Sequence, residues 1–512
     1  MRIAILAWES LHSVAVGGIA AHTSELAAAL AGKGHQLHFF TRRMPGQSAH
    51  ECIDGVHYHR CNYFQQRDFV DDINSMCRSF VDRFFEVEDF VGKFDIVHAH
   101  DWLDANAMIW IKQGREHKTV LTIHSTEYAR CGNAIYNGQS TRIREQERAG
   151  TWWADKVIAV SEATKREITW MYNAPADKVQ VIGNGVDWKR FDIEADPGKV
   201  KAQYGIGPLE PTVLFCGRLA WQKGPDILIE AIPCVLKEHP GAKFVLVGDG
   251  DMRQGLQARA QHLGIWHAVR FLGYRNGAEL VRLFKACDVV CVPSRNEPFG
   301  IVVLEGWSAN KPVVVTENGG AGELIMHEKN GLKIYPRPDS VTWGINRIFS
   351  NFDWSRQLGR NGRVFVEERY SWDKIADKTL EVYRQFCPEP VPQPVEIKQI
   401  SEVSPKVQDT VFAVQSRNEN VTVVLKAKIV IPPSSATNGE AYEILDALKT
   451  NLTSYGFVLQ QKEHYLKIRG ECEEVIKALY ESWERLHQHH NEEGISLQVQ
   501  APSLEGAANG CG

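Results

Sequence analysis

Residues 288–305 of this 512-residue chain read DVVCVPSRNEPFGIVVLE, and this stretch decides the fold class. The apolar, β-branched residues 288–293 predict a short buried strand, and the apolar run after Gly300 predicts a helix. Glu297 then lies in the loop between them, and Glu305 lies about two turns into the helix at ~1.5 Å per residue. A buried strand that leads directly into a helix indicates an α/β protein.

The start of the predicted helix also predicts an anion-binding site. The N–H groups of Gly300, Ile301 and Val302 have no partner within a helix, and the helix dipole attracts negative charge to them. A diphosphate bound there would have a carboxylate on either side, Glu297 and Glu305. Each carboxylate could hold a hydroxyl-rich group, such as a sugar or a ribose. The spacing alone fits a surface loop with a solvated Glu305 equally well.

Around this stretch, strand-like runs alternate with helix-like runs in two series. The first series predicts a helix over 19–33 and strands over 2–8, 36–42, 95–99, 119–124, 156–160 and 179–182. The second predicts helices over 226–238 and 278–286 and strands over 212–216, 244–247, 269–271, 288–292 and 312–316. This alternation is typical of parallel, doubly wound sheets. We therefore expect two Rossmann-like α/β domains, residues 1–187 and 205–370, that face each other across a cleft.

The last part of the chain has a different pattern. Residues 388–409 form a proline-rich linker without periodicity, which predicts a stiff, extended tether. Strands predicted over 421–431, 459–468 and 495–499, with helices over 439–455 and 471–487, indicate a small α+β domain at residues 410–502. This domain carries no motif that indicates a function.

The composition excludes several classes of protein. A net charge of −5 gives neither a nucleic-acid footprint nor a polybasic membrane face. No stretch reaches the ~18–20 apolar residues of a membrane span, and Glu9 ends the first apolar run too early for a signal peptide. The 11 cysteines include no paired C-x-x-C, so we predict neither a disulfide framework nor a zinc site and expect a cytoplasmic protein.

Glycines and cations follow the predicted strands where a phosphate would bind. Gly17 and Gly18 open the first helix, and two glycines let the backbone approach a phosphate or sugar. The full G-x-G-x-x-G pattern is missing, which argues against a nicotinamide enzyme. Arg218 and Lys223 lie five residues apart after strand 212–216 and suit a diphosphate, although two solvated surface cations are the alternative.

Further polar side chains end strands in both domains. Tyr274 and Arg275 follow strand 269–271 and could line a pocket for a base. Asp101 and His124 end strands of the first domain, where a lone histidine is usually a hydrogen-bonded edge residue. Several polar strand ends opposite an anion site nevertheless favour a binding cleft, because ligands of these folds lie beyond the carboxyl ends of the strands.

Taken as a set, these motifs resemble the retaining family-4 glycosyltransferases of GT-B fold, most closely the glycogen synthase and sucrose synthase-like branch. The resemblance covers residues 1–387 and implies that residues 371–387 form a crossover helix packed back on the first domain. It is carried by Gly17-Gly18, His100-Asp101-Trp102, Thr122-Ile123-His124, Asn184-Gly185-Val186-Asp187, Gly217-Arg218-Leu219, Gln222-Lys223-Gly224, Gly248-Asp249-Gly250 and the segment from Glu297 to Glu305.

The resemblance implies a role for each site residue. The catalytic residues would be Glu297, against the donor sugar, and His124, on its outer hydroxyls. Asp101 would lie on the acceptor side. Donor binding would fall to residues that hold the diphosphate, the ribose and the base, namely Gly18, Arg218, Lys223, Tyr274, Arg275, Gly300, Ile301 and Glu305.

The implied function is a hexosyltransferase that moves a sugar, expected to be glucosyl, from a nucleoside-diphosphate sugar to a carbohydrate acceptor. An α-glucan is one candidate acceptor, but Ala15 stands where bacterial glycogen synthases carry a lysine, which argues against glucan synthesis and an ADP-sugar. No metal or other cofactor is expected, and the C-terminal domain could mediate oligomerisation. The alternatives are a non-catalytic nucleotide-sugar sensor that engages a partner and a GT-B-fold sugar-nucleotide 2-epimerase.

Overall fold

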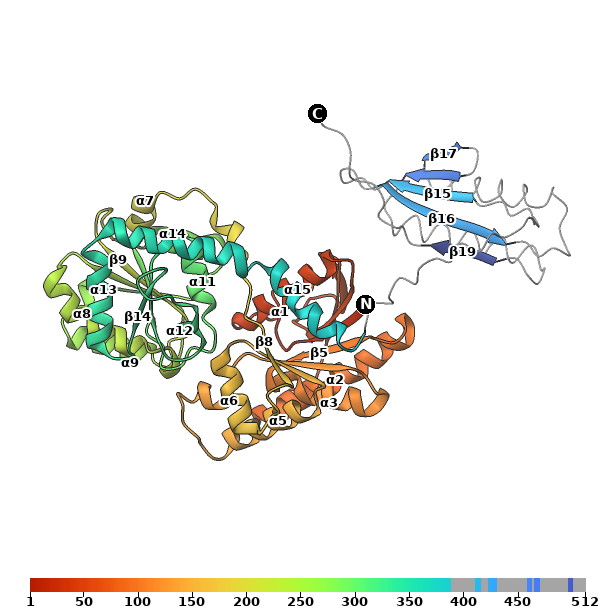
Figure 1. The fold of residues 1–512 in the computed structure, drawn as a ribbon, viewed down its shortest axis with the longest axis horizontal. Coiled ribbons are helices and arrows are strands. Elements are labelled where there is room, and N and C mark those ends of the chain that lie inside the picture. Colours follow the sequence, from red (N-terminus) through yellow and green to blue (C-terminus); the bar gives the residue numbers. More distant parts are fainter. Residues whose placement is uncertain (388–409, 416–421, 431–457, 463–464, 470–495, 501–512) are drawn as a thin grey trace. The chain divides into compact units, whose positions relative to one another are not determined.

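The structure, a computed structural model, describes residues 1–387, 410–415, 422–430, 458–462, 465–469 and 496–500. The chain divides into two compact units, Met1–Val391 and Pro392–Gly512, which we describe separately. The first unit contains two parallel sheets and all the helices that the structure describes, as the labels in Figure 1 show.

The first sheet has eight strands in the order β3-β4-β2-β1-β5-β6-β7-β8, and only β3 and β4 pair antiparallel. Its strands are β1 Arg2–Leu6, β2 Gln36–Arg42, β3 His50–Ile53, β4 Val56–Cys61, β5 Ile96–His100, β6 Thr119–Ile123, β7 Lys156–Ala159 and β8 Val179–Val181. Its helices are α1 Gly18–Gly32, α2 Phe69–Val91, α3 Asp101–Arg115, α4 Glu127–Arg130, α5 Gln139–Trp153 and α6 Glu162–Tyr172. The six predicted strands are confirmed. The β3–β4 hairpin was not predicted, because this histidine-rich segment has no apolar run.

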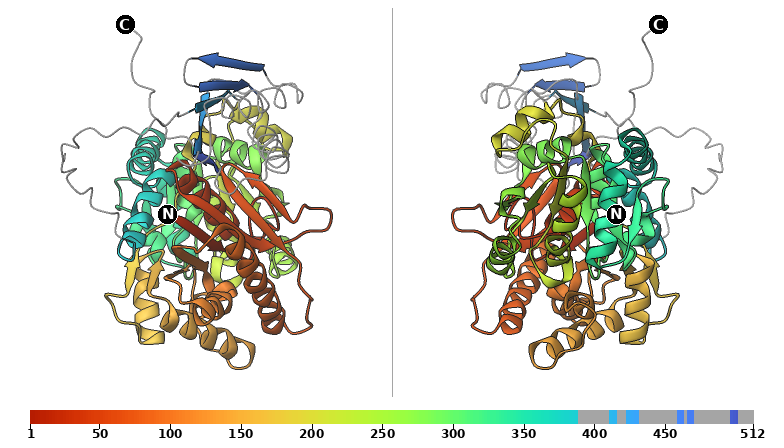
Figure 2. Two further views of the ribbon diagram at one scale, coloured as in Figure 1. Left: turned by 90° about the vertical axis from the view of Figure 1, so that its right-hand side faces the viewer. Right: turned by 90° about the vertical axis from the view of Figure 1, so that its left-hand side faces the viewer.

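Apolar side chains on both faces of the first sheet explain its helical layers. Successive residues of a strand point to opposite faces. On β1, Ala4 and Leu6 therefore enter the core under α2 and α3, whereas Ile3 and Ile5 enter a second core under α1. A sheet that is apolar on both faces must be covered on both, and Figure 2 shows helices on either side of the red and orange strands.

The second sheet has six strands, all parallel, in the order β11-β10-β9-β12-β13-β14. Its strands are β9 Thr212–Cys216, β10 Lys243–Val247, β11 Val269–Gly273, β12 Val289–Val292, β13 Val313–Thr316 and β14 Leu332–Ile334. Its helices are α7 Pro197–Gln203, α8 Pro225–Glu238, α9 Arg253–His262, α10 Gly277–Ala286, α11 Ile301–Ser308, α12 Gly320–Leu324, α13 Pro338–Phe349 and α14 Phe352–Arg369. The expected pair of parallel α/β sheets is thus confirmed. The three-residue β14 was too short to predict.

The last helix of the first unit, α15 Trp372–Arg384, returns from the second sheet to the first. The Ser371 side chain caps this helix by accepting a hydrogen bond from the Lys374 backbone N–H. Ile375 and Leu380 pack into the same core as Ile3 and Ile5, beside α1. The apolar face of α15 therefore holds the end of this unit on the first sheet.

The described strands of the second unit form one five-stranded sheet in the order β17-β18-β15-β16-β19. They are β15 Thr410–Gln415, β16 Thr422–Val430, β17 Val458–Lys462, β18 Tyr465–Arg469 and β19 Ser496–Gln500. The single strand predicted over 459–468 is instead the antiparallel pair β17 and β18. The linker at 388–409 and the helices predicted over 439–455 and 471–487 lie outside the described residues.

Two bulk properties complete the description. The longest described helix, α2, carries aspartate and glutamate along its length, and none of the described helices combines the length and apolarity that a membrane crossing needs. Among the described residues, eight cysteines are free thiols, namely Cys61, Cys77, Cys131, Cys216, Cys234, Cys287, Cys291 and Cys387.

Candidate functional site

The loop between β12 and α11 lies where the sequence predicts an anion-binding site, directly before the N-terminus of α11. Gly300 caps α11 with φ 93°. A Cβ at Gly300 would also lie 2.8 Å from the Cβ of Ala321, so both the backbone angle and the space require glycine. Because the helix begins only at Ile301, Glu305 lies about one turn into it. Our expectation of two turns was wrong, because Glu305 is only four positions after Ile301 and one turn takes 3.6 residues.

Glu297 is buried and paired with Lys223. The Lys223 ammonium lies 2.8 Å from both carboxylate oxygens of Glu297, and the Ser294 hydroxyl donates to one of them at 3.0 Å. Only 5% of the Glu297 surface is exposed. A carboxylate this buried needs charged or hydrogen-bonding partners, and Lys223 with Ser294 supplies both.

The loop after β9 brings Lys223 to this position. It ends in the short 3-10 helix η2 Trp221–Lys223, followed by Gly224 at φ 64°. A Cβ at Gly224 would lie 2.3 Å from the Pro293 carbonyl oxygen, so glycine alone allows the loop to approach the end of β12. Arg218, in the same loop, is exposed and donates to the Gln222 side chain at 3.3 Å.

Arg295 anchors the same loop, and the sequence analysis missed it. Its guanidinium lies 3.3 Å from the Trp221 ring centroid and donates to both Asp226 carboxylate oxygens, at 2.9 and 2.6 Å. This forked contact, together with the ring, fixes the guanidinium plane. Arg295 therefore links the loop that carries Lys223 to the loop that carries Glu297.

Glu305 also has a partner that the sequence analysis missed. It forms an ion pair with Arg190 from the 3-10 helix η1 Trp188–Phe191, in the connector between the two sheets. Burial raises the pKa of Glu305, and Arg190 opposes that rise. The only sequence signal was a basic residue three positions after the Asn184–Asp187 motif.

Tyr274 and Arg275 lie on an outer loop after β11. Tyr274 is 62% exposed, and Arg275 pairs with Glu279 of α10 at 2.7 Å. A backbone hydrogen bond ties the end of β11 to the loop after β10, since the Gly248 N–H donates to the Gly273 carbonyl at 2.8 Å. The assignment of Tyr274 and Arg275 to a base pocket stays a prediction.

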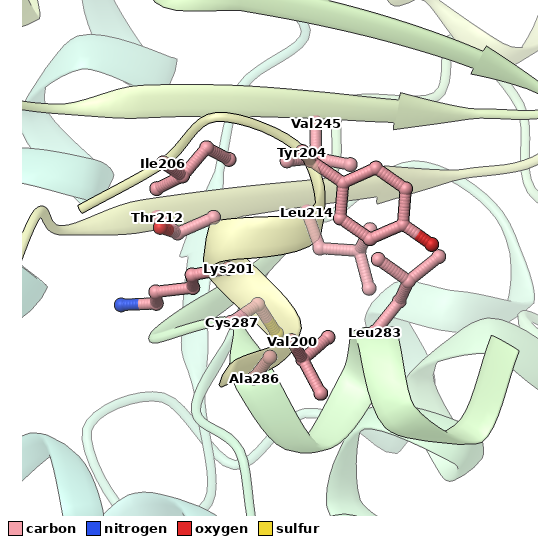
Figure 3. A pocket seen from close by; sticks show the side chains of 10 residues that line it. All are labelled: Val200, Lys201, Tyr204, Ile206, Thr212, Leu214, Val245, Leu283, Ala286 and Cys287. Carbon is pink, nitrogen blue, oxygen red and sulfur yellow. The ribbon is translucent and has the colours of Figure 1, made fainter. Parts of the chain in front are cut away.

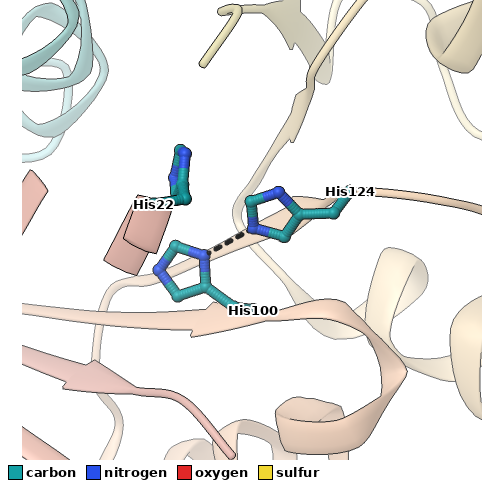
Figure 4. A group of neighbouring side chains, drawn as sticks. All are labelled: His22, His100 and His124. Atoms are coloured by element: carbon teal, nitrogen blue, oxygen red, sulfur yellow. Dashed lines mark hydrogen bonds between the residues drawn. The ribbon is translucent and has the colours of Figure 1, made fainter. Parts of the chain in front are cut away.

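Histidines gather at the carboxyl ends of β5 and β6 in the first sheet. His100 Nδ1 and His124 Nε2 are 3.1 Å apart, and the rings of His22 and His124 meet edge to face with centroids 4.5 Å apart (Figure 4). Burial lowers the pKa of His124 to about 3, so its imidazole is neutral at pH 7.

Asp101 holds the His124 backbone in place. Its Oδ1 accepts a hydrogen bond from the His124 N–H at 2.6 Å, and the residue is only 3% exposed. Burial raises its pKa to about 7. Asp101 adopts a left-handed φ of 58°, which only a few per cent of non-glycine residues do. Its acceptor-side role stays a prediction, while the contact seen here positions His124.

The glycine loop of the first sheet meets the start of α11. The Glu9 carboxylate accepts from the N–H groups of Val16 and Gly17, at 2.6 and 2.7 Å, and so fixes this loop. A Cβ at Gly18 would lie 3.3 Å from the Ile301 Cδ1. The predicted sites at Gly18 and Ile301 are therefore neighbours.

Hydrogen bonds also join the two halves next to Glu297. Asn296 donates to Asn133 at 2.6 Å and to Glu167 at 2.9 Å, and both partners belong to the first half of the chain. No sequence motif pointed to Asn296 or to its partners. The predicted residues Gly18, Glu297, Gly300 and Ile301 thus come together at one junction between the two sheets.

A small pocket elsewhere in the second half is unrelated to this junction. Figure 3 shows it between α7, β9, β10 and α10, with Val200, Tyr204, Leu214 and Leu283 in its wall. It offers space for about one water molecule and is too small for a sugar. We therefore keep the junction as the candidate site.

Comparison with known proteins agrees with this geometry. Residues 16–190 match the family described as Glycosyltransferase Family 4, and residues 198–365 match the one described as Glycosyl transferases group 1. An uncharacterised glycosyltransferase of Methanocaldococcus jannaschii is 38% identical over 395 residues, which cover 75% of this chain and 98% of the relative. A glycogen synthase of Mycobacterium tuberculosis is 28% identical over 401 residues, covering 75% of this chain and 94% of the relative.

Solved structures share the fold. A sucrose-phosphate synthase from Thermosynechococcus elongatus superposes with a TM-score of 0.65 at 25% identity, covering 76% of this chain and 99% of that one. Anabaena HepE, solved in complex with UDP-glucose, gives a TM-score of 0.60 at 22% identity, covering 75% of this chain and 100% of that one. With both parallel sheets, the matched segments and a relative at 38% identity, the chain belongs to glycosyltransferase family 4 and has its GT-B fold.

Proposed function

We propose that this glycosyltransferase moves a glucosyl group, with retention of configuration, from UDP-glucose to a carbohydrate acceptor. The observation that carries the proposal is the Lys223–Glu297 pair beside the N-terminus of α11. It combines a cation for a diphosphate with a carboxylate for the sugar. We further propose residues 1–187 as the acceptor-side domain, residues 205–370 as the donor domain and residues 410–502 as an appended α+β domain.

Departure of the nucleoside diphosphate requires stabilisation of the negative charge that develops on it. Lys223, Arg218 and the N–H groups at the start of α11 would supply this stabilisation. An ammonium group has three N–H donors. Lys223 could therefore keep one bond to Glu297 while the diphosphate takes another.

The carboxylates and His124 would act on the two sugars of the donor. Glu297, held by Lys223 and Ser294, would favour the positive charge that develops at the anomeric carbon. The neutral His124 ring can bind hydroxyl groups of the transferred sugar as donor or acceptor. Glu305 would bind the ribose hydroxyls, which requires Arg190 to release or share this carboxylate.

The donor is inferred from two observations. HepE, which has the same fold, was solved with UDP-glucose, and Ala15 replaces the lysine that bacterial glycogen synthases carry. The acceptor is a carbohydrate by family resemblance, and an α-glucan is one candidate because a glycogen synthase is among the relatives.

Turnover of nucleotide sugars by the purified full-length chain tests this proposal. We expect UDP release from UDP-glucose that depends on an added carbohydrate acceptor, and a product with the α configuration of the donor. Nucleotide release that needs no acceptor, with an epimerised sugar, would instead identify a 2-epimerase. Failure of UDP- and ADP-sugars alike to turn over or bind would contradict the proposal.

A substitution of Lys223 tests the diphosphate site itself. Lys223→Ala should reduce stabilisation of the transition state by ~2–4 kcal/mol, because a cation near the leaving group is lost. We therefore expect kcat/KM for the donor to fall roughly 30- to 1000-fold. Lys237→Ala, on the exposed surface of α8, is the matched control and should leave kcat/KM unchanged. If the two substitutions changed kcat/KM equally, Lys223 would not belong to the donor site.

A further inference from the structure

Three histidines from three elements converge at the carboxyl edge of the first sheet. His22 comes from α1, His100 ends β5 and His124 follows β6 (Figure 4). Each offers one ring nitrogen, and the three nitrogens lie within 4.8 Å of one another. We propose that His22, His100 and His124 bind a divalent transition-metal ion, zinc by preference, with water as the fourth ligand.

Unused hydrogen-bonding capacity is the first argument. Both ring nitrogens of His22 are buried and lack a hydrogen-bond partner among the described residues. Buried polar nitrogens without partners are unfavourable and uncommon in folded proteins. A metal ion would use the lone pair of one nitrogen on each ring.

The neighbouring His98 shows what a purely structural histidine looks like here. Its Nδ1 is 2.6 Å from the Tyr383 hydroxyl and its Nε2 is 2.7 Å from the Thr122 hydroxyl, so both nitrogens have partners. His98 stacks on His100 with ring centroids 4.3 Å apart. His98 thus has a hydrogen-bond partner for each ring nitrogen, whereas His22, within the described part of the chain, has one for neither.

The spacing of the nitrogens suits a tetrahedral ion. His100 Nδ1 and His124 Nε2 are 3.1 Å apart. Two nitrogens bound at zinc–nitrogen distances of 2.0–2.1 Å in a tetrahedron are about 3.3 Å apart. A nitrogen of His22 must approach them by up to about 1.5 Å from its present position, which requires a small torsion of the His22 side chain.

The chemistry of the donors selects the ion. Three imidazoles without a carboxylate suit zinc, cobalt or copper and do not suit magnesium or calcium, which take oxygen ligands. Burial lowers the pKa of all three rings, so they are neutral and hold their lone pairs at pH 7. The hydrogen shared between His100 Nδ1 and His124 Nε2 must leave when the ion binds; it moves to the other nitrogen of the ring that carries it, so both rings stay neutral and no proton is gained or lost.

Metal binding would have a consequence for transfer that rests on the proposed function. His124 Nε2 cannot hold an ion and a sugar hydroxyl together. A bound ion should therefore inhibit the enzyme reversibly, and a chelator should restore activity. The binding measurements below do not depend on this consequence, so failure of the transferase proposal would leave them intact.

The test is a titration of chelator-treated, full-length protein with Co2+. We expect one tightly bound equivalent with the visible absorption of tetrahedral cobalt, and displacement by Zn2+. His22→Gln should weaken this binding by at least about 100-fold, because one of three protein ligands is lost.

A control variant removes two histidines of the β3–β4 hairpin, by His50→Gln and His57→Gln, and one of the histidines at positions 487–490, by His489→Gln. His50 and His57 face each other on β3 and β4, with ring nitrogens 3.3 Å apart. This variant should keep the tight equivalent. Loss of that equivalent in the control variant, or its retention in a folded His22→Gln variant, would overturn the proposal.

X-ray absorption of the control variant with one equivalent of zinc gives a second test that does not require His22→Gln to fold. We expect three imidazole nitrogens and one light oxygen ligand. A sulfur ligand, or fewer than three imidazoles, would overturn the proposal.

Discussion

At the scale of single residues, the site depends on charges that lie far apart in the sequence and are buried together. Lys223 and Glu297 are separated by 74 positions, and their charged groups are 2.8 Å apart. Glu305 and Arg190 are separated by 115 positions and also pair. Each carboxylate is paired with a cation from another loop, which makes its burial tolerable.

Glu297→Gln tests the proposed catalytic carboxylate. The amide keeps the size of the side chain but removes the negative charge, so we expect kcat to fall about 100-fold or more. The dissociation constant of UDP should change far less, since the diphosphate is held by other groups. Steady-state kinetics and calorimetric UDP binding measure the two effects. A kcat within a few-fold of wild type would contradict the catalytic assignment, and the exposed Glu381→Gln on α15 serves as control.

Asp104 of α3 predicts a pH dependence of stability. It is fully buried, its Oδ2 accepts from the Trp8 N–H at 3.2 Å, and burial raises its pKa well above the usual value. The folded chain therefore holds a proton that the unfolded chain releases near pH 4. This contribution to the free energy of unfolding declines as pH rises from that point toward the folded pKa.

Asp104→Asn removes this titration. The free energy of unfolding of the variant relative to wild type should therefore increase between pH 4 and pH 8, measured by urea unfolding at each pH. The exposed Asp82→Asn on α2 should show no such trend. A difference that stays constant with pH would show that Asp104 is ionised in the folded protein throughout this range.

At the scale of elements, the junction joins the start of α11 to loops of the first sheet. The Asn296 amide bridges Asn133 and Glu167, and the Thr126 hydroxyl donates to the other oxygen of Glu167 at 2.6 Å. Because Asn296 precedes Glu297, this bridge also sets where Glu297 lies relative to the histidines of β5 and β6.

Asn296→Ala should therefore affect turnover more than donor binding. Loss of the bridge lets Glu297 shift relative to His124, and a misplacement of about 1 Å can cost roughly 10- to 100-fold in rate. We expect kcat to fall and the UDP dissociation constant to stay within a few-fold. Asn361→Ala, on α14, is the control. An equal loss in kcat and UDP affinity would place Asn296 in the donor site instead.

At the scale of the whole molecule, α15 belongs to the first sheet although it follows the second. Its apolar face completes the core that contains Ile3, Ile5 and α1. The chain divides into compact units only after this helix, with the second unit starting at Pro392. The crossover is therefore part of the transferase, and the appended strands form a sheet of their own.

A chain that ends at Cys387 should fold and bind UDP as the full-length protein does, because it keeps α15 and both parallel sheets. A chain that ends at Arg369 loses the α15 core residues and should unfold at a lower temperature. Thermal unfolding with and without UDP measures both, since a ligand that binds only the folded state raises its stability. Aggregation of the longer chain, or its failure to bind UDP, would show that the appended unit is part of the catalytic core.

The sequence by itself determined the features that depend on residues close together in the chain, which are the strands and the turns. Continuous apolar runs predicted eleven of the parallel strands. The glycines at 17, 18 and 300 marked the starts of α1 and α11, and Gly300 turns into the left-handed region. Strand and turn preferences act over a few residues, so a single chain shows them. The polar β3–β4 hairpin and the three-residue β14 lack that signal.

Only the tertiary structure decided which distant residues meet. Three contacts join segments that are far apart in the sequence. They are the ion pair of Arg190 with Glu305, the hydrogen bond from Asn296 to Asn133, and the group of His22, His100 and His124. Parallel sheets bring strand ends together according to strand order, and here that order differs from sequence order. Neither spacing nor composition encodes such pairs. Motifs therefore predicted the candidate site, and the packing of the two sheets decided which charged and polar groups its residues contact.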